Sequence, residues 1–263
     1  MLSLNGKSAL VTGASSGLGV DFATILAEGG CNLVLVARRE DRLRSLADDL
    51  ARKHGVHAHV IAMSLSQPDA AQDLYDRIRA LNLTVDVLIN NAGFGVYGPF
   101  TGIPWEREEE MLRLDIIAVV HLTKLFVRDM MARDFGYVLQ VSSIGAYQPS
   151  PTYATYSAAK AFVLSFGEAL NYELRGTNVK VSVLSPGVTE TEFLRVAGQS
   201  KSLFQRFSMM PSRPVAEIGI QAMLRGKPSK VAGAMNALTV WSLRFVPRRL
   251  QAAMASAAMQ VGA

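Results

Sequence analysis

The sequence predicts an α/β fold, a doubly wound parallel sheet in one domain, on the basis of three observations. Short runs rich in Val, Leu and Ile alternate with amphipathic helical patterns, and these runs are apolar on both faces. A glycine-rich turn also joins the first run to the first helical pattern. Since open α/β folds of this length commonly keep one core, we expect residues 1–263 to form a single domain.

Six apolar runs are the expected strands of this sheet. Because both faces of each run are apolar, the strands are expected to lie parallel and to be covered by helices on both sides. We expect them at residues 8–12, 32–37, 57–63, 85–90, 137–142 and 180–184.

Helical patterns fill the connections between these strands. Leu43, Leu46 and Leu50 lie at i, i+3 and i+7, the spacing of one helix face, and a similar spacing recurs over residues 74–81. The least regular stretch lies at residues 190–214 and ends in a segment with two prolines. A loop of this length in a compact domain is usually a lid or binding segment, so we expect it to cover the substrate.

A turn with three glycines, TGASSGLG, follows the first strand and precedes a helical pattern. Glycines suit a tight turn, a close approach to a pyrophosphate and close packing of helix on strand, and the helix N-terminus attracts an anion. An ordinary strand-to-helix turn is the alternative for this motif alone. The residues expected to contact a dinucleotide here are Gly13, Ser15, Ser16, Gly17, Leu18 and Gly19.

Further motifs follow the glycine turn in a characteristic order. Residues 90–93 read N-N-A-G, Tyr156 and Lys160 form Y-x-x-x-K, and Ser143 stands 13 residues before Tyr156. Residues 186–191 fit P-G-x-x-x-T. With the T-G-x-x-x-G-x-G turn, these motifs make the chain resemble the short-chain dehydrogenase/reductase family as far as about residue 230.

This resemblance implies a Rossmann-type sheet and hydride transfer between a nicotinamide cofactor and a carbonyl or alcohol. Residues 231–263 depart from a minimal reductase, and their pattern predicts a helical C-terminal extension. Beyond the glycine turn, it places these residues at the cofactor: Ser64, Leu65, Asn91, Ala92, Gly93, Tyr156, Lys160, Pro186, Gly187, Val188 and Thr191.

The end of the second strand predicts which form of the cofactor is bound. An acidic residue there would bind the ribose diol of NAD, but the chain has Ala37 followed by Arg38 and Arg39. Arginine pairs well with a 2′-phosphate, so the sequence favours NADP(H), with Arg38 as the main partner and Arg39 as helper or bystander.

Tyr156 and Lys160 are four residues apart in an expected helix, so their side chains share one face. A nearby ammonium and the charged nicotinamide favour phenolate, and we predict that the pKa of Tyr156 lies below the ordinary value of ~10. Tyr156 would donate the proton in reduction and accept it in oxidation, while Ser143 holds the substrate oxygen. The resemblance also places Lys160 at the nicotinamide ribose.

Three nearby hydroxyl groups compete for these roles. Tyr153 has Ser157, not a lysine, four residues further on. Ser142 is expected to point to the opposite face of the strand end from Ser143. Tyr147 is instead a candidate for the substrate pocket.

Two positions depart from the family pattern. Where the family often has an asparagine that helps to organise a proton path, this chain has Asp115, which accepts but does not donate hydrogen bonds when ionised. Asp115 is therefore expected either to change the proton path or to pair with Lys160. Ser64 stands where an aspartate usually lies near the adenine amine.

The substrate is expected to be a hydrophobic ketone, aldehyde or secondary alcohol. The residues expected to line its pocket are mostly apolar or aromatic, and no arginine among them would hold a carboxylate. They are Phe94, Tyr97, Ser143, Tyr147, Val188, Phe193 and Leu194.

Composition limits the other partners. The net charge of +5 is spread among acidic residues, which does not favour nucleic acid, and the histidines form no metal-like cluster. The only cysteine, Cys31, is expected to be a packing residue, and without a visible export signal we expect a cytoplasmic protein. The resemblance implies a homodimer or homotetramer built on helices near residues 107–133 and 153–175. The apolar C-terminal segment is compatible with a pocket seal, a dimer contact or peripheral contact with a membrane.

Two other functions compete with the reductase. A sugar-nucleotide epimerase or dehydratase of an extended family would usually carry a longer substrate domain. A catalytically weakened NADPH-binding regulator or scaffold of the same fold is favoured only by Asp115 and Ser64.

Overall fold

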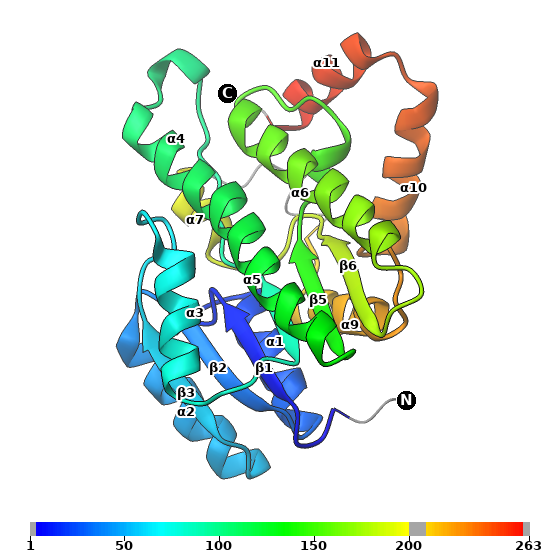
Figure 1. The fold of residues 1–263 in the computed structure, drawn as a ribbon. Coiled ribbons are helices and arrows are strands. Elements are labelled where there is room, and N and C mark those ends of the chain that lie inside the picture. Colours follow the sequence, from blue (N-terminus) through cyan, green and yellow to red (C-terminus); the bar gives the residue numbers. More distant parts are fainter. Residues whose placement is uncertain (1–3, 200–208, 260–263) are drawn as a thin grey trace.

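The computed structural model describes residues 4–199 and 209–259, and a seven-stranded parallel sheet lies at its centre (Figure 1). The strands follow the order β3-β2-β1-β4-β5-β6-β7. Since the order reverses between β1 and β4, the carboxyl ends of these two strands flank the position where such sheets bind ligands. The bounds are β1 (Ser8–Thr12), β2 (Asn32–Ala37), β3 (Ala58–Ala62), β4 (Val87–Asn90), β5 (Gly136–Val141), β6 (Val179–Ser185) and β7 (Ser229–Val231).

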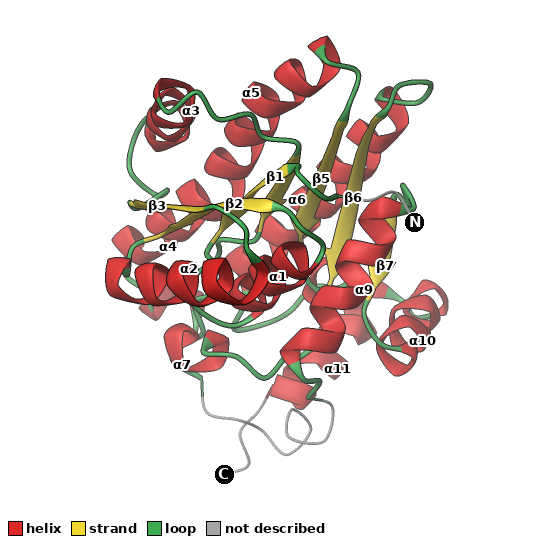
Figure 2. Ribbon diagram, turned by 90° about the horizontal axis from the view of Figure 1, so that it is seen from below, coloured by secondary structure: helices red, strands yellow, loops and turns green. Residues whose placement is uncertain are grey.

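Helices cover both faces of the sheet, as Figure 2 shows from below. Neighbouring strand residues point into opposite layers: Leu10 packs in the core with α3 and α5, whereas Val11 packs with α1, α2 and α9. Both side chains are fully buried, which explains why the strand sequences are continuously apolar. One layer holds α1 (Leu18–Glu28), α2 (Glu40–His54) and α9 (Ser212–Leu224), and the other holds α3 (Ala70–Ala80), α5 (Val119–Ala132) and α6 (Ala154–Glu173).

The predicted doubly wound sheet is confirmed, and the six predicted strands agree with β1 to β6 to within two residues at each end. The seventh strand, β7, was missed. It contains three residues, Ser229, Lys230 and Val231, none of them fully buried, so it carries no apolar run. Only its pairing with the end of β6 makes it a strand.

The helix before β5 is interrupted by a π-helical segment. α4 (Trp105–Leu112) leads into η2 (Arg113–Ala118), which continues directly into α5. Asp115 lies in η2 and is fully buried. A π-helical segment is uncommon and often lies at a functional site, where it changes the direction of a side chain.

The C-terminal segment is helical, as expected, over α10 (Ala234–Ser242), η4 (Leu243–Phe245) and α11 (Arg248–Met259). α10 packs beside β7 at the edge of the sheet. Within the part of the chain that the structure describes, every helix is too short or too polar to cross a bilayer. The predicted substrate loop and C-terminal extension lie partly outside the described residues, at 200–208 and 260–263.

Candidate active site

A cavity of about 530 Å³ opens at the carboxyl ends of the strands. Its wall contains the glycine turn, the ends of β2 to β6 and the start of α7 (Phe193–Ala197). Most of the predicted cofactor residues lie on this wall: Gly13, Ser15, Ser16, Gly17, Leu18, Arg38, Arg39, Ser64, Leu65, Asn91, Ala92, Gly93, Tyr156, Lys160, Pro186, Gly187, Val188 and Thr191.

The glycine turn is shaped so that only glycine fits at its key positions. Gly13 has φ +69°, and a Cβ there would lie 2.8 Å from Asn91 Nδ2. Gly17 has φ +54°, and its Cβ would lie 2.8 Å from the Thr191 methyl group. Gly19 is not on the cavity wall but packs against the Gly13 carbonyl. The turn therefore presents bare backbone and the start of α1 to the cavity, which fits the pyrophosphate of a dinucleotide.

The N-N-A-G element is joined to this turn by hydrogen bonds. Asn91 Nδ2 donates to the Thr12 carbonyl at 2.9 Å, and the backbone N–H groups of Asn91 and Ala92 both donate to Thr12 Oγ1 at 3.0 Å. Asn90 points away from the cavity and bonds Thr123 and Gln140 in the core. The loops after β1 and β4 are thus held as one rigid unit beneath the cavity.

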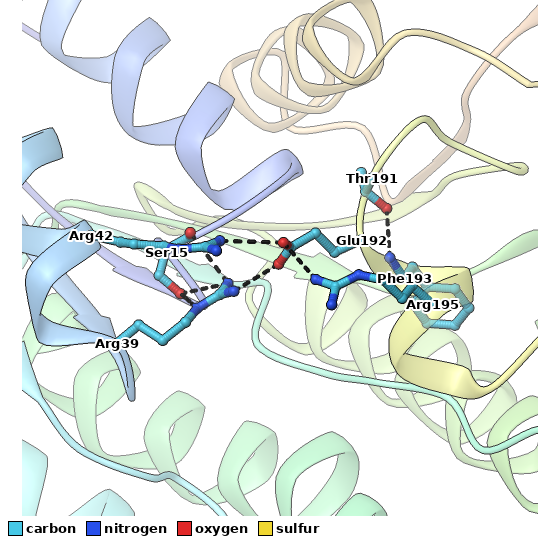
Figure 3. Close-up of polar contacts among 7 residues, drawn as sticks. All are labelled: Ser15, Arg39, Arg42, Thr191, Glu192, Phe193 and Arg195. Atoms are coloured by element: carbon cyan, nitrogen blue, oxygen red, sulfur yellow. Dashed lines mark hydrogen bonds and ion pairs between the residues drawn. The ribbon is translucent and has the colours of Figure 1, made fainter.

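The two arginines at the end of β2 have different surroundings. Arg38 is largely exposed, with 65% of its side chain accessible, and pairs with Glu110 at 3.1 Å. Arg39 binds the Ser15 hydroxyl through Nε and Nη2, each at 3.1 Å, and pairs with Glu192 at 2.7 Å (Figure 3). Its distant partner Glu192 was not among the predicted site residues, since 153 positions separate the two in sequence.

Glu192 is the centre of a cluster of charges over the glycine turn. Its carboxylate also contacts Arg42 on α2 at 3.3 Å and Arg195 on α7 at 2.7 Å (Figure 3). Hydrogen bonds from Arg39 and Arg42 hold the pKa of Glu192 at about 2, so this carboxylate stays charged across the working pH range.

The three predicted reacting residues lie together at the inner end of the cavity. Tyr156 and Lys160 come from the first turns of α6, and Ser143 follows β5. Ser143 Oγ accepts a hydrogen bond from Gly145 N–H at 3.1 Å and also bonds the Tyr156 hydroxyl. The neighbouring Ser142 instead bonds the Lys160 carbonyl, which leaves Ser143 as the serine next to the phenol.

Asp115 lies behind the cavity wall and pairs with Lys160. Lys160 Nζ lies 2.9 Å from Asp115 Oδ2, and both side chains are buried. Asp115 Oδ1 also accepts a hydrogen bond from Phe94 N–H at 3.2 Å. Burial raises the pKa of Asp115, although the ammonium opposes this change. Of the two expected outcomes for Asp115, the structure shows the pairing with Lys160.

The predicted lowering of the Tyr156 pKa included the charge of the nicotinamide, and the chain alone does not produce it. Burial raises the pKa of Tyr156, and the negative charge of Asp115 raises it further, while the hydrogen bond with Ser143 acts the other way. The sequence argument counted the ammonium of Lys160 but not the carboxylate that neutralises it.

The predicted substrate residues separate into two groups. Phe94, Phe193 and Leu194 line the cavity, and the Phe193 ring lies 5.3 Å from that of Tyr156. Tyr97 and Tyr147 are not on the cavity wall: Tyr97 packs behind Tyr153, and Tyr147 bonds Ser185.

Tyr153 is on the wall, although the sequence treated it only as a competitor of Tyr156. Its hydroxyl donates to Gln199 Oε1 at 2.8 Å, which joins α6 to the segment after α7. Gln199 was also missed, because a glutamine in an irregular loop carries no pattern. On the adenine side, Ser64 lies on the wall and bonds Ser66 at 2.9 Å.

Comparison with known proteins agrees with this geometry. The family model described as short chain dehydrogenase matches residues 7–202. The 7beta-hydroxysteroid dehydrogenase of Collinsella aerofaciens is 33% identical over 189 residues, which cover 72% of this chain and 71% of the relative. The very-long-chain 3-oxoacyl-CoA reductase of Phaeosphaeria nodorum is 34% identical over 197 residues, 73% of this chain but only 57% of the relative.

A solved structure shows the same fold over nearly the whole chain. It is a short-chain dehydrogenase from Sphingobium yanoikuyae in complex with NADPH, with a TM-score of 0.82 and 27% identity over 93% of this chain and 94% of the other. With the family model covering most of the sequence and the motif residues gathered in one cavity, the chain belongs to the short-chain dehydrogenase/reductase family.

Proposed function

We propose that this protein is an NADP(H)-dependent oxidoreductase that interconverts a bulky apolar ketone or aldehyde and its alcohol. The observation that carries this proposal is one cavity with a glycine turn at one end and Ser143, Tyr156 and Lys160 at the other. When bound, the nicotinamide would supply or accept the hydride. The exposed Arg38 is available to a 2′-phosphate, and a relative solved with NADPH supports the same preference.

The chain's own residues account for the movement of the proton. The Tyr156 hydroxyl donates its proton to the carbonyl oxygen in reduction and takes one back in oxidation. Ser143 donates a hydrogen bond to the same oxygen and stabilises the charge that develops there. Burial raises the pKa of Tyr156, so the phenol is protonated at neutral pH and holds the proton that reduction requires.

The proposed substrate class follows from the aromatic and aliphatic side of the cavity. Phe94, Phe193 and Leu194 offer apolar surface beside Tyr156. Two relatives are named for a hydroxysteroid and a very-long-chain 3-oxoacyl-CoA, of which the ring system and the acyl chain are large and apolar. A cyclic or long-chain ketone therefore suits this cavity better than a small charged one.

The test is NADPH oxidation by the purified protein with a panel of steroid and long-chain ketones, with NADH and Tyr156→Phe in parallel. We expect turnover with NADPH that falls by about 10²- to 10⁴-fold in Tyr156→Phe, while NADPH binding is kept. Turnover that survives in the variant would refute the proposed role of Tyr156.

A second candidate function is a cofactor-binding protein with weak turnover, favoured by the Asp115–Lys160 ion pair. This pair neutralises the ammonium that would otherwise assist Tyr156. This second function predicts tight NADPH binding with no reaction across the panel of ketones. It also predicts that Asp115→Asn recovers turnover.

The predicted homodimer or homotetramer stays a prediction. It places the subunit contacts on the helices around α5 and α6. Large apolar side chains are exposed there: Ile117 in η2, just before α5, and Phe162 and Tyr172 in α6. Light scattering of the purified protein tests it directly.

A further inference from the structure

The first inference concerns Glu192, which shares Arg39 with the predicted phosphate site. Nη1 of Arg39 is bound by Glu192, and both Nε and Nη2 are bound by Ser15, so protein groups already engage every nitrogen of this guanidinium. Arg38 makes a single ion pair and is mostly exposed. Arg38 is therefore the more accessible of the two to a phosphate, which can reach Arg39 Nη1 only in competition with the carboxylate.

Carboxylate and phosphate oxygens bind a guanidinium in the same way, through charge-assisted hydrogen bonds to its fork. Glu192 lies on the cavity wall with both arginines, directly after the predicted cofactor residue Thr191. Its side chain is 29% exposed, so water and a ligand can both reach it.

We propose that Glu192 occupies the anion position beside Arg39 and thereby limits how strongly the chain prefers NADP(H) to NAD(H). This inference rests on the proposed function, because it assumes that the adenosine end of the cofactor lies at Arg38 and Arg39. Removing the carboxylate frees Arg39 for the 2′-phosphate and removes a negative charge next to it. NADH, which lacks this phosphate, gains nothing from the free arginine.

The experiment measures the Kd of NADPH and of NADH by fluorescence titration for the wild type and Glu192→Gln. We expect Glu192→Gln to tighten NADPH roughly three- to tenfold and to leave NADH within about twofold. Glu190→Gln is the matched control, because it removes the same charge from the same loop where the structure shows no ion pair with these arginines. In an Arg39→Ala background, Glu192→Gln should no longer tighten NADPH binding.

An equal effect of Glu192→Gln on both cofactors, or weaker NADPH binding, would overturn the inference. If the wild type bound neither cofactor, the proposed function itself would fail. The two failures are therefore distinguishable.

The second inference concerns the C-terminal surface, which combines apolar exposure with an uneven distribution of charge. Residues 218–263 contain no Asp or Glu and six basic residues, Arg225, Lys227, Lys230, Arg244, Arg248 and Arg249. The whole chain, in contrast, has 27 basic and 22 acidic residues. The excess of positive charge is thus concentrated in the last part of the chain.

The same segment leaves large apolar side chains in water. α10 has no fully buried residue, and Met235, Leu238, Trp241 and Phe245 are 74%, 57%, 52% and 71% exposed. Trp241 and Phe245 are in contact, with ring centroids 5.0 Å apart, so part of this surface is continuous. α10 and α11 lie at the outer edge of the molecule, away from α1 to α3 (Figure 1). Exposed apolar groups of this kind mark a contact surface.

We infer that this surface, defined by Met235, Leu238, Trp241 and Phe245 with Arg244, Arg248 and Arg249 beside it, docks onto an anionic lipid bilayer. Aromatic and aliphatic side chains enter the interface of a bilayer, and nearby arginines are attracted to acidic headgroups. A symmetric contact with a second copy of the chain would bring two basic surfaces together. The positive charge of this surface therefore favours an anionic bilayer over a second copy as its partner.

The test is flotation of the full chain with phosphatidylcholine vesicles with and without phosphatidylserine. We expect binding only to the vesicles that contain phosphatidylserine, and at least about a tenfold loss of binding in the double variant Trp241→Ala, Phe245→Ala. Trp105→Ala is the matched control, since it removes an exposed tryptophan from α4. No binding to either vesicle, or concentration-dependent dimerisation lost in the same double variant, would overturn the inference.

Discussion

The loops after β1 and β4 and the segment after β6 line the same cavity but are held in different ways. Beneath the cofactor end, Thr12, Asn91 and Ala92 are joined by partly buried hydrogen bonds that involve the backbone, and Gly13 has neither the space nor the backbone conformation for a side chain. Over the cavity, the segment that carries Glu192 is held by ion pairs that water can reach. Buried backbone contacts tolerate few residue types, whereas exposed ion pairs contribute little to stability and can be exchanged.

The family model covers residues 7–202, so it includes both of these regions and ends within the substrate loop. The part of the chain that binds a common cofactor is constrained by backbone geometry. The later part, including α10 and α11, is where a protein of this fold can vary its substrate and its contacts. Four substitutions test this division.

The largest effect is expected for Gly13→Ala. Alanine at φ +69° is strained, and its Cβ would lie within 2.9 Å of both Asn91 Nδ2 and Ala92 Cα. We expect loss of NADPH binding and a fall in the free energy of unfolding of about 2–4 kcal/mol, measured by urea denaturation. Gly55→Ala is the control, since φ is +68° there but no atom would lie within 4 Å of the added Cβ. This variant should lower the free energy of unfolding by only about 1 kcal/mol. Equal losses in both variants would contradict the special constraint at the glycine turn.

Asp115→Asn is expected to change the pH profile. The charge of Asp115 raises the pKa of Tyr156, so its removal lowers that pKa and makes phenolate available at lower pH. Alcohol oxidation should then reach half its maximal rate at a lower pH than in the wild type, and reduction should also decline at a lower pH. Glu108→Gln is the control, because this buried acid bonds Thr155. Superimposable profiles for the wild type and Asp115→Asn would show that the ion pair does not control Tyr156.

Tyr153→Phe tests the segment over the cavity. It removes the hydroxyl that bonds Gln199 but keeps the ring beside Tyr156. We expect the KM for the ketone to rise about two- to tenfold with kcat within about twofold, because one hydrogen bond of a cavity wall is lost. Tyr97→Phe, which keeps the ring packing against Tyr153, should leave KM unchanged. A fall in kcat alone would assign Tyr153 to the chemistry instead.

The smallest effect on activity is expected for Cys31→Ala. Cys31 is fully buried, as predicted, and burial raises its pKa to about 12. Little thiolate exists at neutral pH, so the native thiol should react with a disulfide reagent about a thousandfold more slowly than in urea, while Cys31→Ala keeps its activity within about twofold. Fast modification of the native protein would show that the packing around β1 and β2 opens readily.

The sequence predicted the sheet and most of the cavity wall because backbone constraints leave a pattern. Glycines at Gly13 and Gly17 and the spacing of Tyr156 and Lys160 follow from local geometry, so they are visible in a short window. β7 carried no such pattern, because pairing with β6 rather than burial makes it a strand. The environment of Tyr156 and the partner of Arg39 depend on Asp115 and Glu192, which approach from distant parts of the chain. Aromatic residues such as Tyr97 and Tyr147 gave no indication of which way they point.

The contact between Gly17 and Thr191 has a consequence for the order in which ligands enter. The Thr191 methyl group packs against the glycine turn, and Phe193, two residues later, packs against Tyr156. One short segment therefore contacts both the glycine turn and Tyr156. A ketone held beneath this segment would block the path of the dinucleotide, so turnover should follow a compulsory order in which the nicotinamide cofactor binds first and leaves last.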